Sequence, residues 1–401
     1  MPRLLAVVVA VLLVAGVSGL AVHEDPSPPP QEVVQPTTVE VSPTSTTVPG
    51  QPTTTTVPAA ASPLIALVAE LQSFVERSRG LKFKEPVKVT LLDDKAFRQR
   101  ITDESKVDKE EIRKITKVLR ALDLIEPDVD LEKAQRALLG GAVLGFYDLE
   151  KKELFVRGAK ITPAVRQTLV HELVHALQDQ HFGVHRPDLG KQDDEAEQAF
   201  TGLVEGDASR IEDMYEKTMS KRDRERAKAE QESHADGLED VPPILLESLG
   251  FPYVVGPVFV EAVFQAGGQA RLDAAFGAPP TTSEQLIHPE KFLRGEGAAP
   301  VNEPPAEGAV IDRGVFGELG FIQQLQNDIE DRTTLFRAAN GWGGDRYIAW
   351  ENGDRACVRV DVVMDTPRDA DELRAALQQW ADNHDDATVT GTSPIRFTSC
   401  A

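Results

Sequence analysis

Two histidines and a glutamate near the middle of the chain have the types and spacing needed to bind a metal ion and activate water. His171, Glu172 and His175 belong to the run His-Glu-Leu-Val-His, and side chains four residues apart in a helix project from the same face. Two imidazoles at this spacing can share one tetrahedral zinc ion, while the glutamate beside the first of them can reach a water molecule on the metal. The run therefore predicts a Zn²⁺ site with Glu172 as a general base.

The helix that must carry this run is expected to be long and buried. Thr162 can cap its first turn and Pro163 suits that turn, and nothing breaks the chain until about Phe182. The alternative, two solvated histidines on an amphipathic helix, is disfavoured because the residues around them are apolar. These apolar neighbours are Leu169, Leu173, Val174 and Leu177.

The third ligand decides the type of zinc site, because a hydrolytic zinc normally has three protein ligands and leaves the fourth position to water. His181 stands ten residues after His171, which at about 100° per residue turns it about 80° away from that face of the helix. Glu205 is the better candidate, because it lies in an otherwise apolar stretch and a buried carboxylate needs a cation. His181 as the third ligand is the less favoured alternative.

Glu205 lies on a second long helix, expected from about Asp193 to Met219. Gly202 and Gly206 weaken this helix by about 1 kcal/mol each relative to alanine. Their presence predicts that another part of the molecule approaches the helix backbone closely. The highly charged segment that follows, residues 221–239, is expected to be a solvated loop or a helix end.

The two-helix arrangement resembles the gluzincin metallopeptidases, in which a His-Glu-x-x-His helix is followed by a glutamate on the next helix. The resemblance implies that His171, His175 and Glu205 bind Zn²⁺ and that Glu172 is the general base. Further motifs after residue 63 are similar to those of a family of uncharacterised bacterial exported zinc metallopeptidases. These motifs lie at residues 171–182, 203–208, 280–285, 288–291 and 341–346.

One position departs from the gluzincin pattern. Enzymes of the thermolysin type place an aspartate four residues after the ligand glutamate, where it orients the first histidine, whereas this chain has Ser209 there. The nearest aspartate is Asp207, two residues after Glu205 and therefore about 200° around the helix. Asp207 is not expected to reach His171, and a role as a surface carboxylate is the alternative.

The oxyanion formed when water attacks a peptide carbonyl usually needs a donor besides the metal. His288 is the leading candidate, because it sits in a proline-bounded segment that could form one wall of a cleft. The alternative is a histidine that fixes a turn by hydrogen bonding. Further donors that the sequence does not rank are Tyr253, Tyr347 and Arg346.

These residues together predict hydrolysis of a peptide or protein substrate. The alternative from another class is an exported binding protein with a structural or vestigial zinc site and no turnover. Glu172 argues against this alternative, because a structural site has no use for an acid beside an open coordination position. Nucleic acid is not an expected partner, since 43 basic and 65 acidic residues give a net charge of −22, and phosphate contacts need a basic face.

The N-terminus predicts export. Residues 4–22 are apolar apart from Ser18 and follow Arg3, which is typical of a cleaved signal peptide or an uncleaved signal anchor, and both remain open. Residues 23–62 contain no lysine or arginine and are rich in proline and threonine, which indicates a disordered stalk. The protein is therefore expected outside the cell or at its surface, with membrane contact only through an uncleaved N-terminal segment.

The order of the elements after Pro63 indicates an α+β fold of zincin-like type in one domain, residues 63–401. Its expected parts are an N-terminal part (63–160), the zinc-site helices (161–300) and a C-terminal part (301–401) in the order β-β-α-β-β. The N-terminal part should contain a strand at 86–92, helices at 110–122 and 131–139, and a hairpin of strands 143–147 and 153–157.

Only two cysteines occur, Cys357 and Cys400, which excludes a multi-cysteine metal site. Both lie on expected strands, and in an exported protein they are expected to form a disulfide bond. Two buried thiols are the alternative, because sequence does not show that they are close.

Overall fold

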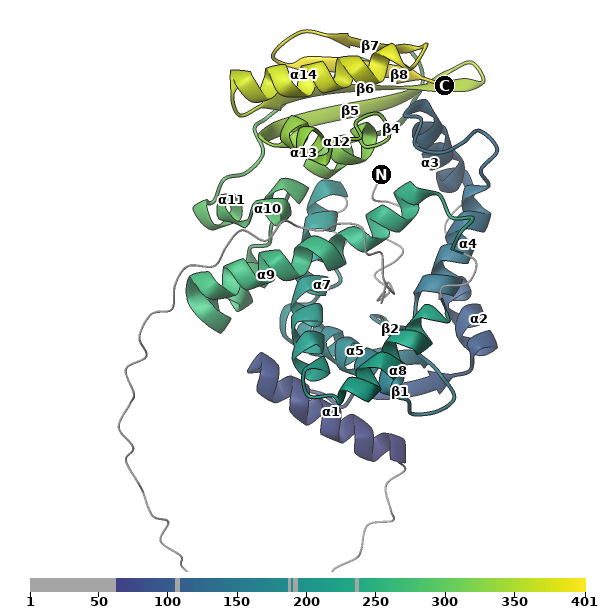
Figure 1. Ribbon diagram of the computed structural model, residues 1–401, viewed down its shortest axis with the longest axis vertical. Helices are drawn as coiled ribbons and strands as arrows, with labels where there is room; N and C mark the ends of the chain where they lie inside the picture. Colours follow the sequence, from purple (N-terminus) through teal and green to yellow (C-terminus); the bar gives the residue numbers. More distant parts are fainter. Residues whose placement is uncertain (1–62, 105–108, 187–188, 190–193, 235–237) are drawn as a thin grey trace, which may run out of the picture.

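The computed structural model describes residues 63–104, 109–186, 189, 194–234 and 238–401. Within these ranges the chain has a mixed α+β fold, as the sequence predicted. Helices surround two separate sheets (Figure 1). The predictions for the signal segment and the stalk concern residues 1–62, which lie outside the described residues.

The N-terminal part builds a small sheet against the motif helix. β1 and β3 are parallel, with Val89 paired to Leu154, and β2 pairs antiparallel with β3, so the strand order is β1-β3-β2. The predicted strand, both helices and the hairpin are present, with bounds shifted by a few residues. The elements are α1 (Pro63–Arg79), β1 (Lys88–Leu92), α2 (Asp94–Glu104), α3 (Lys109–Ala121), α4 (Leu131–Ala142), β2 (Gly145–Asp148) and β3 (Glu153–Arg157).

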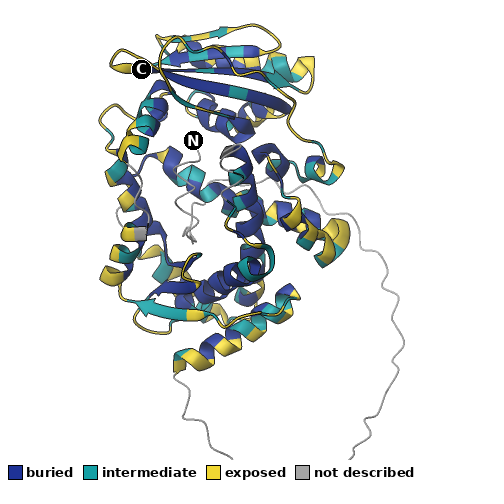
Figure 2. Ribbon diagram, turned by 180° about the vertical axis from the view of Figure 1, so that it is seen from behind, coloured by how far each residue is buried: buried dark blue, intermediate teal, exposed yellow. Residues whose placement is uncertain are grey.

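The motif helix α5 (Pro163–Phe182) begins and ends as its sequence predicts. The Thr162 hydroxyl accepts a hydrogen bond from the Val165 backbone amide, and Pro163 occupies the first turn. Gly183 ends the helix in the left-handed conformation with φ 66°, which favours glycine. Residues 164–178 are buried apart from Arg166, so the helix is dark blue over most of its length in Figure 2.

The second predicted helix is α7 (Asp194–Glu216), and its two glycines make room for α9 (Pro243–Gly277). A Cβ atom on Gly206 would lie 2.3 Å from the Gly256 carbonyl oxygen, and one on Gly256 would lie 2.3 Å from the Gly202 carbonyl oxygen. A Cβ on Gly202 would also lie 2.3 Å from Leu286 Cδ1. The predicted close approach is therefore confirmed, and α9 is the main partner.

α9 continues through two prolines, Pro252 and Pro257, and bends at Gly267 and Gly268, where φ at Gly268 is 64°. Among the described residues it is the one helix long and apolar enough to cross a membrane, with 44% of its most apolar window buried. Part of that burial is against α7.

The charged segment after α7 differs from its prediction, since residues 221–232 form helix α8 (Lys221–Glu232). The Ser220 hydroxyl accepts a hydrogen bond from the Asp223 amide and caps its first turn. Of its side chains only Ala227 is buried, so the segment is solvated, but as a helix. The two short helices after α9 are α10 (Ser283–Ile287) and α11 (Pro289–Arg294).

The C-terminal part is an antiparallel sheet with the order β4-β5-β6-β8-β7, seen with its helices at the top of Figure 1. Alternate residues of β6, among them Val358 and Val360, share a core with Leu377 of α14 and Phe321 of α12. The predicted β-β-α-β-β order is confirmed, and β4, α12 and α13 precede it. The elements are β4 (Val310–Gly314), α12 (Gly317–Leu325), α13 (Arg332–Ala339), β5 (Trp342–Asn352), β6 (Arg355–Met364), α14 (Pro367–Asp382), β7 (Ala387–Thr390) and β8 (Ile395–Cys400).

Cys357 of β6 lies opposite Cys400 of β8 in the sheet register. Their sulfur atoms form a disulfide bond. The predicted pairing is therefore present.

Candidate metal centre

Helices α5 and α7 bring the three predicted ligands together. One possible ligand atom each from His171, His175 and Glu205 lies within 4.8 Å of the others. Glu205 Oε2 is 3.1 Å from His171 Nε2 and 3.3 Å from His175 Nε2. All three side chains are buried. The structure thus contains a cluster, His171–His175–Glu205, that could hold a metal ion.

His171 is held by a carboxylate that the sequence analysis did not identify. Glu212 Oε2 lies 2.7 Å from His171 Nδ1. An ionised carboxylate can only accept a hydrogen bond, so Nδ1 carries a proton, and Nε2 is the ring nitrogen that faces Glu205 and the cluster. Glu212 stands seven residues after Glu205, which is two helical turns and hence the same face of α7. Two acids at this spacing in a buried helix are the sequence signal for this pairing, and the gluzincin pattern, which places the orienting acid at position 209, does not contain it.

His175 is held by the side-chain amide of Gln178. His175 Nδ1 lies 2.9 Å from Gln178 Oε1, and Gln178 Nε2 donates to the Val204 carbonyl oxygen at 3.0 Å and to Asp207 Oδ2 at 3.1 Å. Both of these oxygens only accept, so the NH₂ group must face them and Oε1 must face the imidazole. His175 Nδ1 therefore donates, and its Nε2 also presents a lone pair to the cluster.

The side chains of His171, His175 and Glu205 together have the chemistry of a cation-binding site. His175 Nε2 is buried and has no hydrogen-bond partner within the part of the chain that the structure describes, because its contact with Glu205 lacks hydrogen-bond geometry. Two imidazole lone pairs and a carboxylate facing one another repel unless a proton or a metal ion lies between them. Two histidines and one glutamate are a ligand set found in catalytic zinc sites.

The contacts between imidazoles and carboxylates also shift the pKa values of His171 and Glu205. Burial alone would lower the pKa of His171, but its hydrogen bonds with Glu205 and Glu212 outweigh burial and raise that pKa to about 10. Burial would raise the pKa of Glu205, but His175 and His171 hold it well below its usual value. The carboxylates thus attract positive charge to the place where the two imidazoles meet Glu205.

Glu172 lies beside the cluster with its carboxylate unpaired. Its side chain is fully buried, and neither carboxylate oxygen has a hydrogen-bond partner among the described residues. A Cβ atom on Gly145, the first residue of β2, would lie 2.8 Å from Glu172 Oε1, so the glycine leaves room for this carboxylate. Burial raises the pKa of Glu172 well above its usual value; His171 opposes this rise, and Glu205 and Glu212 add to it.

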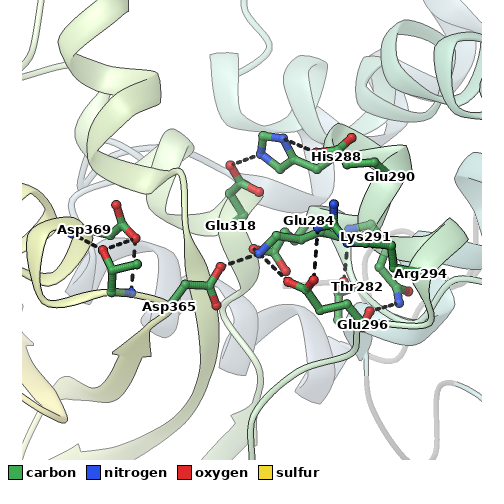
Figure 3. A network of polar contacts seen from close by, with 12 residues as sticks. Thr282, Glu284, His288, Glu290, Lys291, Arg294, Glu296, Glu318, Asp365 and Asp369 are labelled. Atoms are coloured by element: carbon green, nitrogen blue, oxygen red, sulfur yellow. Dashed lines mark hydrogen bonds and ion pairs between the residues drawn. The ribbon is translucent and has the colours of Figure 1, made fainter.

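His288 lies between α10 and α11 and contacts other acids. Its Nε2 is 3.0 Å from Glu318 Oε1 and its Nδ1 is 4.0 Å from Glu290 Oε1. Figure 3 shows His288 between these two carboxylates. Burial would lower the pKa of His288, but the hydrogen bond with Glu318 outweighs it and the pKa rises. Neither contact is to a residue of the cluster, so a role of His288 at the oxyanion stays a prediction.

Two further candidate donors, Tyr253 and Tyr347, and the alternative ligand His181 differ in their distance from the cluster. Tyr253 on α9 has its ring centroid 6.2 Å from that of His171, so it lies near the cluster. Tyr347 donates instead to Asp312 Oδ2, on the neighbouring strand β4. His181 Nε2 lies 2.8 Å from the Lys82 carbonyl oxygen, and His181 does not belong to the cluster.

One family model matches the C-terminal part of the chain. Residues 268–399 match a family model described as "Domain of unknown function (DUF8575)". The match begins at the bend of α9 and covers the C-terminal sheet, and it lies after α5 and α7. No curated protein and no solved structure matches the chain significantly.

Proposed function

We propose that the chain is an exported zinc-dependent metallopeptidase with a zincin-like fold, in which His171, His175 and Glu205 bind Zn²⁺. The observation that carries the proposal is the unpaired, buried carboxylate of Glu172 beside two imidazoles and a second carboxylate, that of Glu205. A ligand set of two histidines and one glutamate with an adjacent acid is the arrangement that zinc hydrolases need.

In the proposed hydrolysis, each residue around the metal would have a separate role. Bound zinc would supply Lewis-acid activation of a water molecule and of the substrate carbonyl. Glu172 would accept the proton of that water and return it to the leaving amine, and it is free to do so because neither oxygen has a partner among the described residues. Glu212 and Gln178 would keep both imidazoles turned with Nε2 toward the ligand position.

The expected substrate is a peptide or protein. Tyr253 joins His288 as a candidate donor to the oxyanion, because its ring lies near His171. The Cys357–Cys400 disulfide supports a location outside the cytoplasm, since such bonds persist in oxidising compartments.

A structural zinc site without turnover is the second candidate, and the burial of the cluster favours it. His171 and Glu172 are 0% exposed and Glu205 is 2% exposed, whereas a substrate has to reach the metal. The unpaired Glu172 favours catalysis, because a structural site does not require a buried acid without a partner.

Metal analysis and a peptide library test the proposal together. Full-length protein should contain about one zinc per chain and no stoichiometric iron, and it should hydrolyse some library members until a chelator removes the metal. Zinc without hydrolysis would leave the structural site as the better interpretation. Iron in place of zinc, or no metal at all, would contradict the proposal at its first step.

A further inference from the structure

Arg79, the last residue of α1, is fully buried between elements that follow it much later in the chain. Its Nε donates to Asp207 Oδ2 at 2.7 Å, and its Nη1 donates to Asp273 Oδ1 at 2.6 Å. The guanidinium carbon lies 5.6 Å from the ring centroid of Phe182 and 5.8 Å from that of Phe276. α1 therefore inserts a cation into the polar interior next to α7.

The Asp207 oxygen that binds Arg79 also binds the side chain that holds His175. Asp207 Oδ2 accepts from Arg79 Nε and from Gln178 Nε2, and Gln178 Oε1 faces His175 Nδ1. Arg79, Asp207, Gln178 and His175 thus form one continuous chain of hydrogen bonds. All four side chains are buried, so water does not readily replace a missing link.

We propose that Arg79 is a positioning residue of the metal centre, acting through Asp207 and Gln178 on the tautomer of His175. The inference rests on the proposed zinc site. Asp207 fixes the Gln178 amide only while its own carboxylate is held in place, and Arg79 Nε is the donor that holds the shared oxygen. If Gln178 turned over, its NH₂ would face His175 Nδ1, and the proton would have to move to Nε2, the atom that faces Glu205.

α1 would therefore support the metal centre as well as pack against α5 and α7. It is the first helix among the described residues. Arg79 at its end is thus connected to His175, nearly a hundred residues later in the chain. Asp207, which is not expected from its position on the helix to reach His171, is connected instead to His175, by way of the Gln178 amide.

Zinc affinity in full-length variants tests the inference through a double-mutant cycle. Arg79→Met keeps an apolar side chain of similar reach and should weaken zinc binding about 10- to 100-fold, because it releases Gln178, and loss of a hydrogen-bond partner of a ligand usually has an effect of this size. Gln178→Leu should weaken binding to a similar degree. The double variant should be no weaker than Gln178→Leu alone, because both changes break the same chain.

Asp273→Asn is the matched control, because it alters the other partner of Arg79 and leaves Asp207 and Gln178 untouched. Its zinc affinity should stay within about threefold of wild type. Wild-type affinity in Arg79→Met, or losses that add in the double variant, would overturn the inference.

Nitrogen-15 spectra of the imidazoles supply a readout that packing alone would not move. Zinc-loaded wild type should show His175 bound through Nε2 and protonated at Nδ1, and binding through Nδ1 would overturn the inference. Arg79→Met should show a second His175 species. If that variant does not fold, Arg79→Lys keeps the charge but puts a methylene where Nε donates, and the same loss, at least about tenfold, is expected.

These outcomes are separable from those of the proposed function. A wild-type protein that binds no zinc would refute the metal site itself. A wild-type protein that binds zinc tightly, with variants of Arg79 that bind it equally well, would refute only the role of Arg79.

Discussion

Glu212 Oε2 lies 2.7 Å from Nδ1 of His171, on the side of the imidazole opposite Glu205. One helix, α7, therefore supplies both the carboxylate that would share the metal with His171 and the carboxylate that orients it. The seven-residue spacing keeps both acids on one face. The position four residues after Glu205, which holds Ser209, is not needed for this purpose.

Glu212→Gln should weaken zinc binding about tenfold. The amide has nearly the same size, but it lacks the charge that makes the histidine a stronger ligand, and it can turn its NH₂ toward Nδ1. Competition with a fluorescent chelator measures the affinity. Asp213→Asn, which removes the exposed neighbouring charge, should leave the affinity near wild type, and an equal loss in both variants would point to a general charge effect.

The choice of the third ligand has a direct test. Glu205→Ala should reduce zinc affinity far more than His181→Ala, because Glu205 Oε2 lies near both imidazoles whereas His181 faces the Lys82 carbonyl. The zinc content of both variants after dialysis against a weak chelator distinguishes the two. The reverse order would favour a metzincin-like ligand set.

The predictable part of the site was local. The spacing of His171, Glu172 and His175 and the caps of α5 are properties of consecutive residues, and both appear in the structure as expected. Glu205, on another helix, is predictable for a different reason, because a carboxylate in an apolar stretch needs a partner. By contrast, Arg79 and Asp207 are 128 residues apart, and no spacing rule connects them.

The largest element that the sequence analysis missed is α9. No element is assigned to residues 243–277 in the sequence analysis, and prolines such as Pro252 and Pro257 normally interrupt a helix. In the structure the helix continues through both prolines, and Gly256 packs on α7 where Gly202 and Gly206 provide the space. In α9, packing against α7 outweighs the tendency of proline to break a helix.

The contact between α7 and α9 predicts opposite effects for two glycines of the same helix. Gly256→Ala should destabilise the fold by about 2 kcal/mol, because its Cβ would meet the Gly202 carbonyl oxygen at 2.3 Å. Gly250→Ala, with nothing within 4 Å of its Cβ, should raise stability by up to about 1 kcal/mol through helix propensity. Denaturant unfolding of both variants measures the difference, and equal effects would contradict the close packing.

The polar network around Lys291 predicts a dependence of stability on pH. Lys291 Nζ lies 2.5 Å from Glu284 Oε1 and 2.5 Å from Asp365 Oδ2 (Figure 3). Burial raises the pKa of Glu284 to about 7, although Lys291 opposes the rise and several carboxylates compete for its one ammonium. The folded state therefore keeps a proton that the unfolded chain loses near pH 4.5, and this stabilisation disappears as the pH rises from about 4.5 to 7.

Glu284→Gln should remove that part of the pH dependence. The amide mimics the protonated acid, so the variant should gain about 2 kcal/mol relative to wild type between pH 5 and pH 7. Urea unfolding at several pH values gives the two curves. Glu296→Gln, which changes an exposed partner of the same lysine, should leave the slope in place, and a slope retained in Glu284→Gln would exclude Glu284 as its source.

Glu172→Gln separates catalysis from metal binding. The amide keeps the size of the side chain and leaves His171, His175 and Glu205 in place, so zinc content and folding should remain near wild type. It removes the proton acceptor, and general-base assistance is commonly worth about 10²- to 10⁴-fold, so peptide hydrolysis at neutral pH should fall at least about a hundredfold. Hydrolysis rates of one library peptide, measured at matched zinc occupancy, provide the comparison. Wild-type activity in the variant would require another base, and in the structure Glu172 is the buried acid beside the cluster whose two oxygens both lack a partner among the described residues.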